Sequence, residues 1–145
     1  MKLKVVLLSV IMTVALNAGD MIVKSSKNSV DKTVQKIENI LKKKGITLFA
    51  IVDYRKGAKS VGTDMTDAKL VIFGNPKLGT KIMQRDIRAG IELPMKVLVY
   101  RDFDGNTKIG YKEPKDIAKG YNLAGCGTLA KLSGAVDMIT TKAGM

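Results

Sequence analysis

Residues 69–114 read KLVIFGNPKLGTKIMQRDIRAGIELPMKVLVYRDFDGNTKIGYKEP, and this stretch decides the fold. It starts with an apolar strand pattern at 70–73, breaks at the Gly-Asn-Pro sequence of 74–76 and continues into a helical pattern. Two strand patterns follow at 95–100 and 107–111, and Asp104-Gly105 between them is typical of a hairpin turn with positive φ angles. A strand, a helix and a hairpin in this order predict most of the sheet of a small α+β domain.

The flanking segments predict the remaining elements. Apolar residues at one-turn spacing indicate a helix that starts after Asn28 or Ser29 as N-cap and ends before Gly45. Residues 47–54 (TLFAIVDY) are almost continuously apolar, which is typical of a central strand covered on both faces. A strand at 21–26 and helices at 115–123 and 128–141 complete an α+β pattern in which helices back a sheet.

Composition limits the class of protein and of partner. With 145 residues, 46% of them hydrophobic and 26% charged, the chain is long enough for one globular domain with its own core. The formal charge of +12 favours a small anionic ligand or an acidic protein partner. The excess is mostly lysine, which makes few planar, bidentate contacts, and no aromatic-basic stacking motif is present. We therefore expect no nucleic-acid partner.

Residues 1–18 have the layout of a secretory signal. Lys2 and Lys4 precede an apolar run at 5–16, and Ala18 is a small residue at the expected cleavage site. The run is shorter than the roughly 20 residues that cross a bilayer, although an uncleaved N-terminal anchor stays an alternative. We predict a bacterial periplasmic or secreted protein without a transmembrane segment once the signal is removed. The mature part, residues 19–145, would be a single domain with a C-terminal helical extension from about 124.

The residue types present exclude several kinds of chemistry. The chain has no histidine, so it lacks the most frequent metal ligand and the usual general base at neutral pH. Residues 102–113 imitate the acidic spacing of a calcium loop, but Thr107 stands where that loop requires glycine. We therefore expect no metal, no cofactor and no catalytic residue, and a role that is more typical of a binding protein than of an enzyme.

The turn after the strand at 70–73 is the candidate ligand site. Main-chain N–H groups that converge from a glycine-rich turn onto a helix N-terminus can bind an anion, and we expect Thr80 to cap that helix. The same turn also serves simply to change the direction of the chain, and it lacks the Gly-Lys-Ser/Thr triplet of a phosphate loop. The predicted anion site comprises Gly74, Asn75, Lys77, Gly79, Thr80 and Lys81.

The one cysteine, Cys126, supports an alternative function. It lies between Gly125 and Gly127, just before the last predicted helix, and a thiol near a helix N-terminus can be reactive. A thiol-dependent redox or transfer protein is therefore the alternative, although a lone cysteine also serves as a small apolar side chain. No intrachain disulfide is available to a single cysteine.

Two segments, IFGNPKLGTKIMQ at 72–84 and GIELPMKVLVYRDFDGNTKIGYKEP at 90–114, resemble the signature of the bacterial domain-of-unknown-function family 302. The resemblance covers residues 29–123 and ends before Cys126. It implies a TATA-binding-protein-like α+β fold with an antiparallel sheet of about four to six strands backed by helices, and a homodimer. It implies no activity, and Tyr121 occupies the segment in which many members of the family have a histidine. The sequence thus predicts an exported, non-enzymatic accessory module that binds a small anion or an acidic partner.

Overall fold

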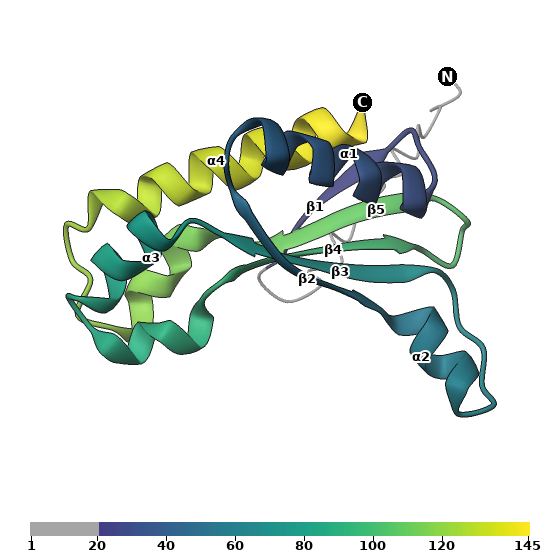
Figure 1. Ribbon diagram of the computed structural model, residues 1–145, viewed down its shortest axis with the longest axis horizontal. Coiled ribbons are helices and arrows are strands. Elements are labelled where there is room, and N and C mark those ends of the chain that lie inside the picture. Colours follow the sequence, from purple (N-terminus) through teal and green to yellow (C-terminus); the bar gives the residue numbers. More distant parts are fainter. Residues whose placement is uncertain (1–20) are drawn as a thin grey trace, which may run out of the picture.

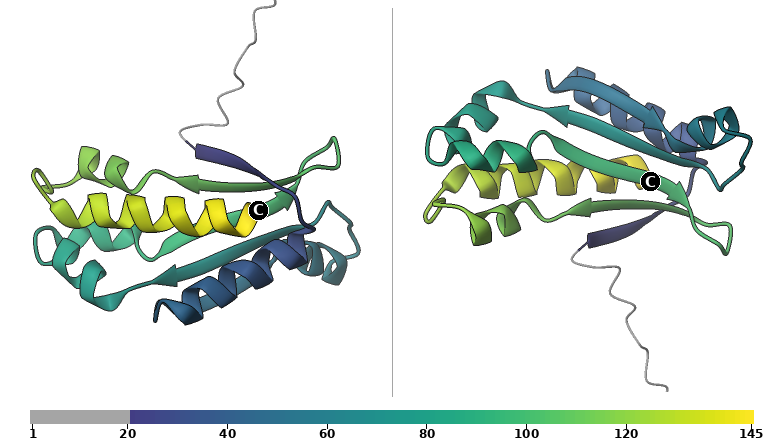
Figure 2. Two further views of the ribbon diagram at one scale, coloured as in Figure 1. Left: turned by 90° about the horizontal axis from the view of Figure 1, so that it is seen from above. Right: turned by 90° about the horizontal axis from the view of Figure 1, so that it is seen from below.

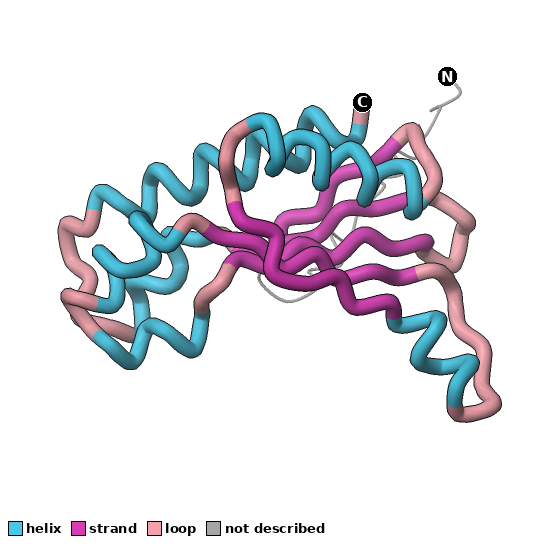
Figure 3. The backbone as a smooth tube through the Cα atoms, in the orientation of Figure 1, coloured by secondary structure: helices cyan, strands magenta, loops and turns pink. Residues whose placement is uncertain are grey.

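The computed structural model describes residues 21–145, so the predicted signal at 1–18 lies outside the described residues. Five strands form one antiparallel sheet in the order β1-β5-β4-β3-β2 (Figure 1, Figure 3). The strands are β1 (Met21–Ser26), β2 (Thr47–Asp53), β3 (Ala68–Gly74), β4 (Met95–Arg101) and β5 (Thr107–Lys112). The predicted α+β class and the predicted antiparallel sheet are confirmed.

Two long helices, α1 (Val30–Lys43) and α4 (Gly127–Gly144), lie on the same face of the sheet (Figure 2). The shorter helices lie in the connections: α2 (Tyr54–Ser60), α3 (Pro76–Met83) and the 3-10 helices η1 (Ile87–Glu92) and η2 (Pro114–Gly120). As the helical spacing predicts, α1 begins after Ser29, whose side chain accepts a hydrogen bond from the amide of Lys32. None of the helices within residues 21–145 is long and apolar enough to span a membrane.

The core lies between the sheet and the two long helices. Fully buried side chains come from the sheet, for example Val97 and Ile109, and from α1, for example Ile37. The segment predicted as a C-terminal extension also contributes, because Val136 and Ile139 of α4 belong to the same buried cluster. Helix α4 is therefore an integral part of the hydrophobic core.

The prediction that residues 47–54 form a central strand is wrong, because β2 pairs only with β3 and lies at the edge of the sheet. Phe49 is 55% exposed and Val52 is 39% exposed. Val61, just after α2, is also exposed. An uninterrupted apolar run indicates that both strand faces are apolar, but it does not indicate whether other elements cover them.

Candidate functional site

The turn predicted as an anion site has a different local structure from the one expected. Helix α3 begins directly at Pro76, a residue suited to the first helical position, and Asn75 is its N-cap. Thr80 therefore lies inside the helix, and its predicted role as cap is wrong. The Asn75 side chain accepts a hydrogen bond from the amide of Lys77 at 3.0 Å. The Asn75 carbonyl accepts from the amides of Leu78 and Gly79 at 2.9 and 3.0 Å, so these three amides are already occupied.

The side chains around the turn are also packed. A Cβ atom added to Gly74 would lie 3.2 Å from the Phe49 ring and 3.3 Å from Cβ of Pro94. Gly74 and Asn75 border a hollow of about 440 Å³ that Lys43 and Lys44 also line. The other four predicted residues, which are Lys77, Gly79, Thr80 and Lys81, do not line that hollow. The structure thus does not gather the six predicted residues around one ligand position.

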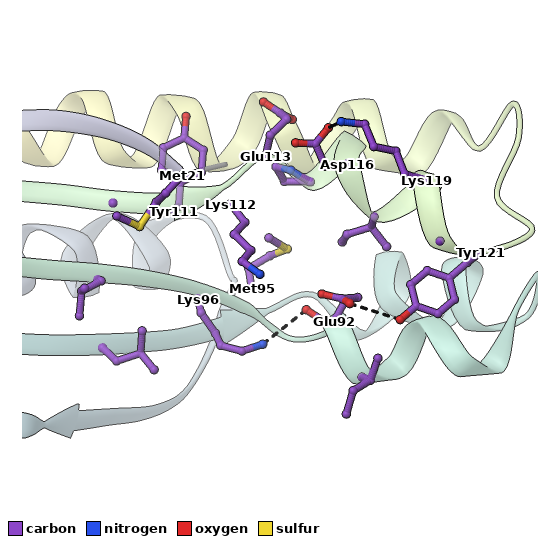
Figure 4. Close-up of a pocket in the computed structure, with 17 residues that line it drawn as sticks. Met21, Glu92, Met95, Lys96, Tyr111, Lys112, Glu113, Asp116, Lys119 and Tyr121 are labelled. Atoms are coloured by element: carbon purple, nitrogen blue, oxygen red, sulfur yellow. Dashed lines mark hydrogen bonds and ion pairs between the residues drawn. The ribbon is translucent and has the colours of Figure 1, made fainter. Parts of the chain in front are cut away.

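A larger cleft, of about 830 Å³, opens where β4 and β5 meet the 3-10 helices η1 and η2 (Figure 4). Its floor is the sheet face turned away from α1 and α4. Along β4, Val97 and Val99 are buried in the core, so the alternating residues Lys96 and Leu98 point to the opposite face. The volume lies within the range of about 300–1,000 Å³ that is typical of small-molecule sites.

Two lysines from neighbouring strands enter this cleft (Figure 4). The register pairs Val97 with Tyr111, which places Lys96 and Lys112 next to each other on the open face. Lys96 Nζ donates to the Pro94 carbonyl at 3.1 Å, and none of residues 21–145 forms an ion pair with either lysine. Like charges at facing positions of neighbouring strands are unfavourable. An anion between these two ammonium groups would relieve that repulsion.

The carboxylates of the cleft wall are engaged with the protein itself. The Tyr121 hydroxyl donates to Oε1 of Glu92 at 3.2 Å, and burial together with this hydrogen bond raises the pKa of the phenol. Tyr121 is therefore a neutral donor at pH 7. Asp116 forms an ion pair with Lys119 at 2.6 Å, and Glu113 accepts a hydrogen bond from the Ser133 hydroxyl. The wall carboxylates thus have partners, whereas Lys96 and Lys112 lack ionic ones among the described residues.

Asp86 fixes the position of η1 beside the cleft. Its Oδ1 accepts from Nε of Arg88 at 3.0 Å, and its Oδ2 accepts from Nη2 of Arg88 at 2.7 Å. Oδ2 also accepts from the amide of Asn122 at 3.1 Å, which ties η1 to the segment that carries Tyr121. The Arg88 guanidinium is the main reason that the pKa of Asp86 lies well below its usual range. No local sequence pattern indicates this contact between Asp86 and the amide of Asn122, because the two residues are 36 positions apart in the chain.

Cys126 lies at the N-cap of α4, as predicted, but its side chain makes no capping hydrogen bond. The residue is half-buried and packs against the core cluster. Its amide donates to the Leu123 carbonyl, and its carbonyl accepts from the amide of Leu129. Cys126 does not line either hollow. Within residues 21–145 no group of three or more Cys, Asp or Glu side chains is arranged to hold a metal ion.

Comparison with known proteins gives matches to a family, to curated relatives and to a solved structure. The family model for "Domain of unknown function DUF302" matches residues 21–139, so the match extends past residue 123 and includes Cys126. Two relatives are the proteins named fluoride-specific ion channel FluC 1 of Brucella suis biovar 1 and FluC 2 of Brucella melitensis biotype 1. Each is 33% identical over 98 residues, which are 68% of this chain. The aligned region covers only 39% and 36% of these relatives.

The solved structure is the uncharacterized conserved protein DUF302 from Bacillus stearothermophilus. It superposes with a TM-score of 0.68 at 19% identity, over 88% of this chain and 97% of that chain. At this identity, the likeness shows the shared fold and carries no statement about function.

Proposed function

This chain belongs to the DUF302 family, and from that premise we propose that it is a non-enzymatic accessory module that binds a small anion in the cleft beside η1 and η2. The observation that carries the proposal is the pair Lys96 and Lys112, which enter the cleft side by side without an ionic partner among residues 21–145. Charge-assisted hydrogen bonds from two ammonium groups would hold the anion. The formal charge of +12 would raise its local concentration.

The relatives support a small anion as the ligand class. The Brucella proteins are named fluoride-specific ion channels, and this chain aligns with little more than a third of their length. We propose that the shared region serves anion handling as an accessory module. The cleft is the better site for this role than the Gly74–Lys81 turn, because the main-chain amides at the start of α3 are occupied by Asn75.

Isothermal titration calorimetry with fluoride, phosphate, sulfate, thiosulfate and acetate at constant ionic strength tests the proposal. We expect Lys112→Gln to weaken anion binding by about tenfold or more, because a hydrogen bond to a charged group contributes about 1.5–3 kcal/mol. The matched control is the Lys77→Gln/Lys81→Gln double variant, which removes positive charge at the turn instead. If the control abolishes binding and Lys112→Gln does not, the anion lies at the turn and the cleft assignment is wrong.

The charge pattern of residues 1–18 supports export, which stays part of the proposal. Expression of the full chain in a bacterium, followed by fractionation and N-terminal sequencing, tests this part. We expect a periplasmic or secreted protein that starts near Gly19. Recovery of the intact Met1 terminus from the cytoplasm would contradict it.

We also propose a homodimer that pairs through the edge strand β2. Residues 47–52 carry no charge, so two copies can approach here despite the positive charge of the whole chain. An uncovered apolar edge strand has free main-chain groups that favour pairing with another strand, and a two-fold axis makes the strand its own partner. Helix α2, which follows β2 directly, has no buried residue, so its side chains are also free to contact a second copy of the chain.

Light scattering after size exclusion tests the dimer. We expect Phe49→Lys or Val52→Lys to convert a dimer into a monomer, because each places a charge in the paired edge. Phe103→Lys, at the fully exposed tip of the β4–β5 hairpin, is the matched control and leaves the dimer intact. A monomeric wild type at micromolar concentration would overturn this part of the proposal.

The alternative function, thiol-dependent redox or transfer chemistry, depends on Cys126 alone. Its test is the rate of thiol alkylation as a function of pH, compared with a free cysteine. Reaction at pH 6 much faster than that of free cysteine would favour the alternative. A rate at or below that of free cysteine, together with unchanged anion binding by Cys126→Ser, would favour the binding module.

A further inference from the structure

The cleft is much larger than an inorganic anion, and the lining around the two lysines is largely apolar. A water molecule in the liquid takes up about 30 Å³, so a four-oxygen anion would fill only a small part of the 830 Å³ cleft. Apolar side chains that line it include Met21, Leu70, Ile91, Leu98 and Ile117. On the basis of the proposed function, we infer that the cleft binds an amphipathic monoanion, a carboxylate attached to an apolar chain.

The strand register places the two parts of such a ligand. Lys96 and Leu98 are two residues apart on the same face of β4, which separates them by about 6.6 Å along the strand. Leu98 pairs with Leu70 of β3 and with Gly110 of β5. A carboxylate on Lys96 and Lys112 therefore directs its chain over an apolar pair of side chains.

The floor beside Leu98 is formed by Gly110 and by the Met21 side chain that packs on it. A Cβ atom at position 110 would lie 2.8 Å from the sulfur of Met21, which covers the glycine from β1. The Met21 side chain therefore fills the space above Gly110 and extends the apolar floor beside Leu98, where its flexibility lets it adapt to an alkyl chain. Ile91 of η1 also lines the cleft and is 78% exposed. An apolar occupant would bury these side chains, whereas a bare anion would leave them in water.

The charges of the wall favour a single negative charge on the ligand. Glu92, Glu113 and Asp116 line the same cleft as the lysines. Their carboxylates would repel the additional charges of a di- or trianion, because charges closer together than a Debye length are not fully screened. A neutral amphiphile would form no ion pair with Lys96 or Lys112, and neither lysine has one within residues 21–145. A monocarboxylate would pair with the two lysines and would bring no additional negative charge for the wall carboxylates to repel.

Calorimetry with straight-chain carboxylates of two to ten carbons, each below its micelle concentration, tests the inference. We expect affinity to rise roughly two- to fourfold for each added methylene that is buried. Leu98→Gln is expected to flatten this rise, while Val23→Gln, at an exposed position on the same sheet face but outside the cleft, preserves it. Lys112→Gln is expected to weaken every carboxylate by about tenfold, and octanol is expected to bind much more weakly than octanoate. Circular dichroism melts of each variant establish that it is folded, and Ile91→Gln replaces Leu98→Gln if the latter unfolds.

The outcomes separate this inference from the proposed function. Equal affinity for acetate and decanoate would overturn the amphipathic ligand while anion binding at the lysines still stands. Octanol binding as tightly as octanoate, or chain-length dependence that Lys112→Gln leaves unchanged, would also overturn it. If no carboxylate and no inorganic anion binds, both the inference and the proposed function are wrong.

Flotation with phosphatidylglycerol vesicles distinguishes a lipid from a free carboxylate as the ligand. Flotation that depends on Lys112 supports a lipid as the amphipathic anion. Binding that depends on chain length but gives no flotation supports a free carboxylate.

Discussion

Ile139→Ala tests whether α4 is part of the core of the domain. Ile139 has no exposed surface and belongs to the buried cluster between the helices and the sheet. The change removes three carbon atoms, which costs about 2.4 kcal/mol at about 0.8 kcal/mol for each buried methylene. The cavity that remains adds to this cost, and the higher helix propensity of alanine recovers a few tenths of a kcal/mol. We expect the free energy of unfolding to fall by about 3 kcal/mol.

Urea unfolding followed by circular dichroism measures this loss, with thermal melts as a second readout. Lys131→Ala, at an exposed position of the same helix, is the matched control and should change the stability by less than about 0.5 kcal/mol. For a domain of this size we expect Ile139→Ala to lower the melting temperature by roughly 10 °C, with an unchanged slope in urea. If the two variants differ by less than about 0.5 kcal/mol, α4 is a loosely attached extension and the packing argument is refuted.

Three further predictions concern other contacts of the fold. The lowered pKa of Asp86 stabilises the folded state above the ordinary carboxyl pKa of about 3.9, and this stability is lost as the pH falls through the folded-state pKa. Calorimetry from pH 7 to pH 2.5 should therefore show a steeper loss for the wild type than for Asp86→Asn. Gly144→Ala should destabilise the fold by about 1–3 kcal/mol in urea, because the new Cβ would lie 2.8 Å from a main-chain oxygen of β1. Gly134→Ala, in open space on the same helix, should instead stabilise the fold by up to about 1 kcal/mol. A loss of stability as large as that of Gly144→Ala would contradict the packing difference between the two glycines. Finally, the hydrogen bond from Lys24 is the main reason that the pKa of Asp137 is lowered, so Lys24→Met should raise that pKa in an NMR titration, and no change would refute the assignment.

The candidate site was only partly accessible to sequence analysis. The Asn75-Pro76 pair is a helix-start signal, so the beginning of α3, and with it the use of Asn75 as a cap, could have been predicted. The alternation in β4 also shows Lys96 on the face opposite the buried valines. What alternation does not show is that Lys112 of β5 lies beside Lys96, because this depends on the pairing register of two strands. The clamp between Asp86 and Asn122 likewise joins segments that no local pattern connects.

The sequence by itself determined the class and the local elements: the α+β pattern, the helix after Ser29 and the hairpin at Asp104-Gly105. These features depend on periodicity, capping and turn chemistry, which act over a few neighbouring residues. Only the tertiary structure decided that the apolar strand β2 lies at the edge, that α4 is part of the core, and that Lys96 and Lys112 share a cleft. The physical reason is that strand order and register are set by the burial of side chains from distant segments, and a local pattern does not specify which segments those are.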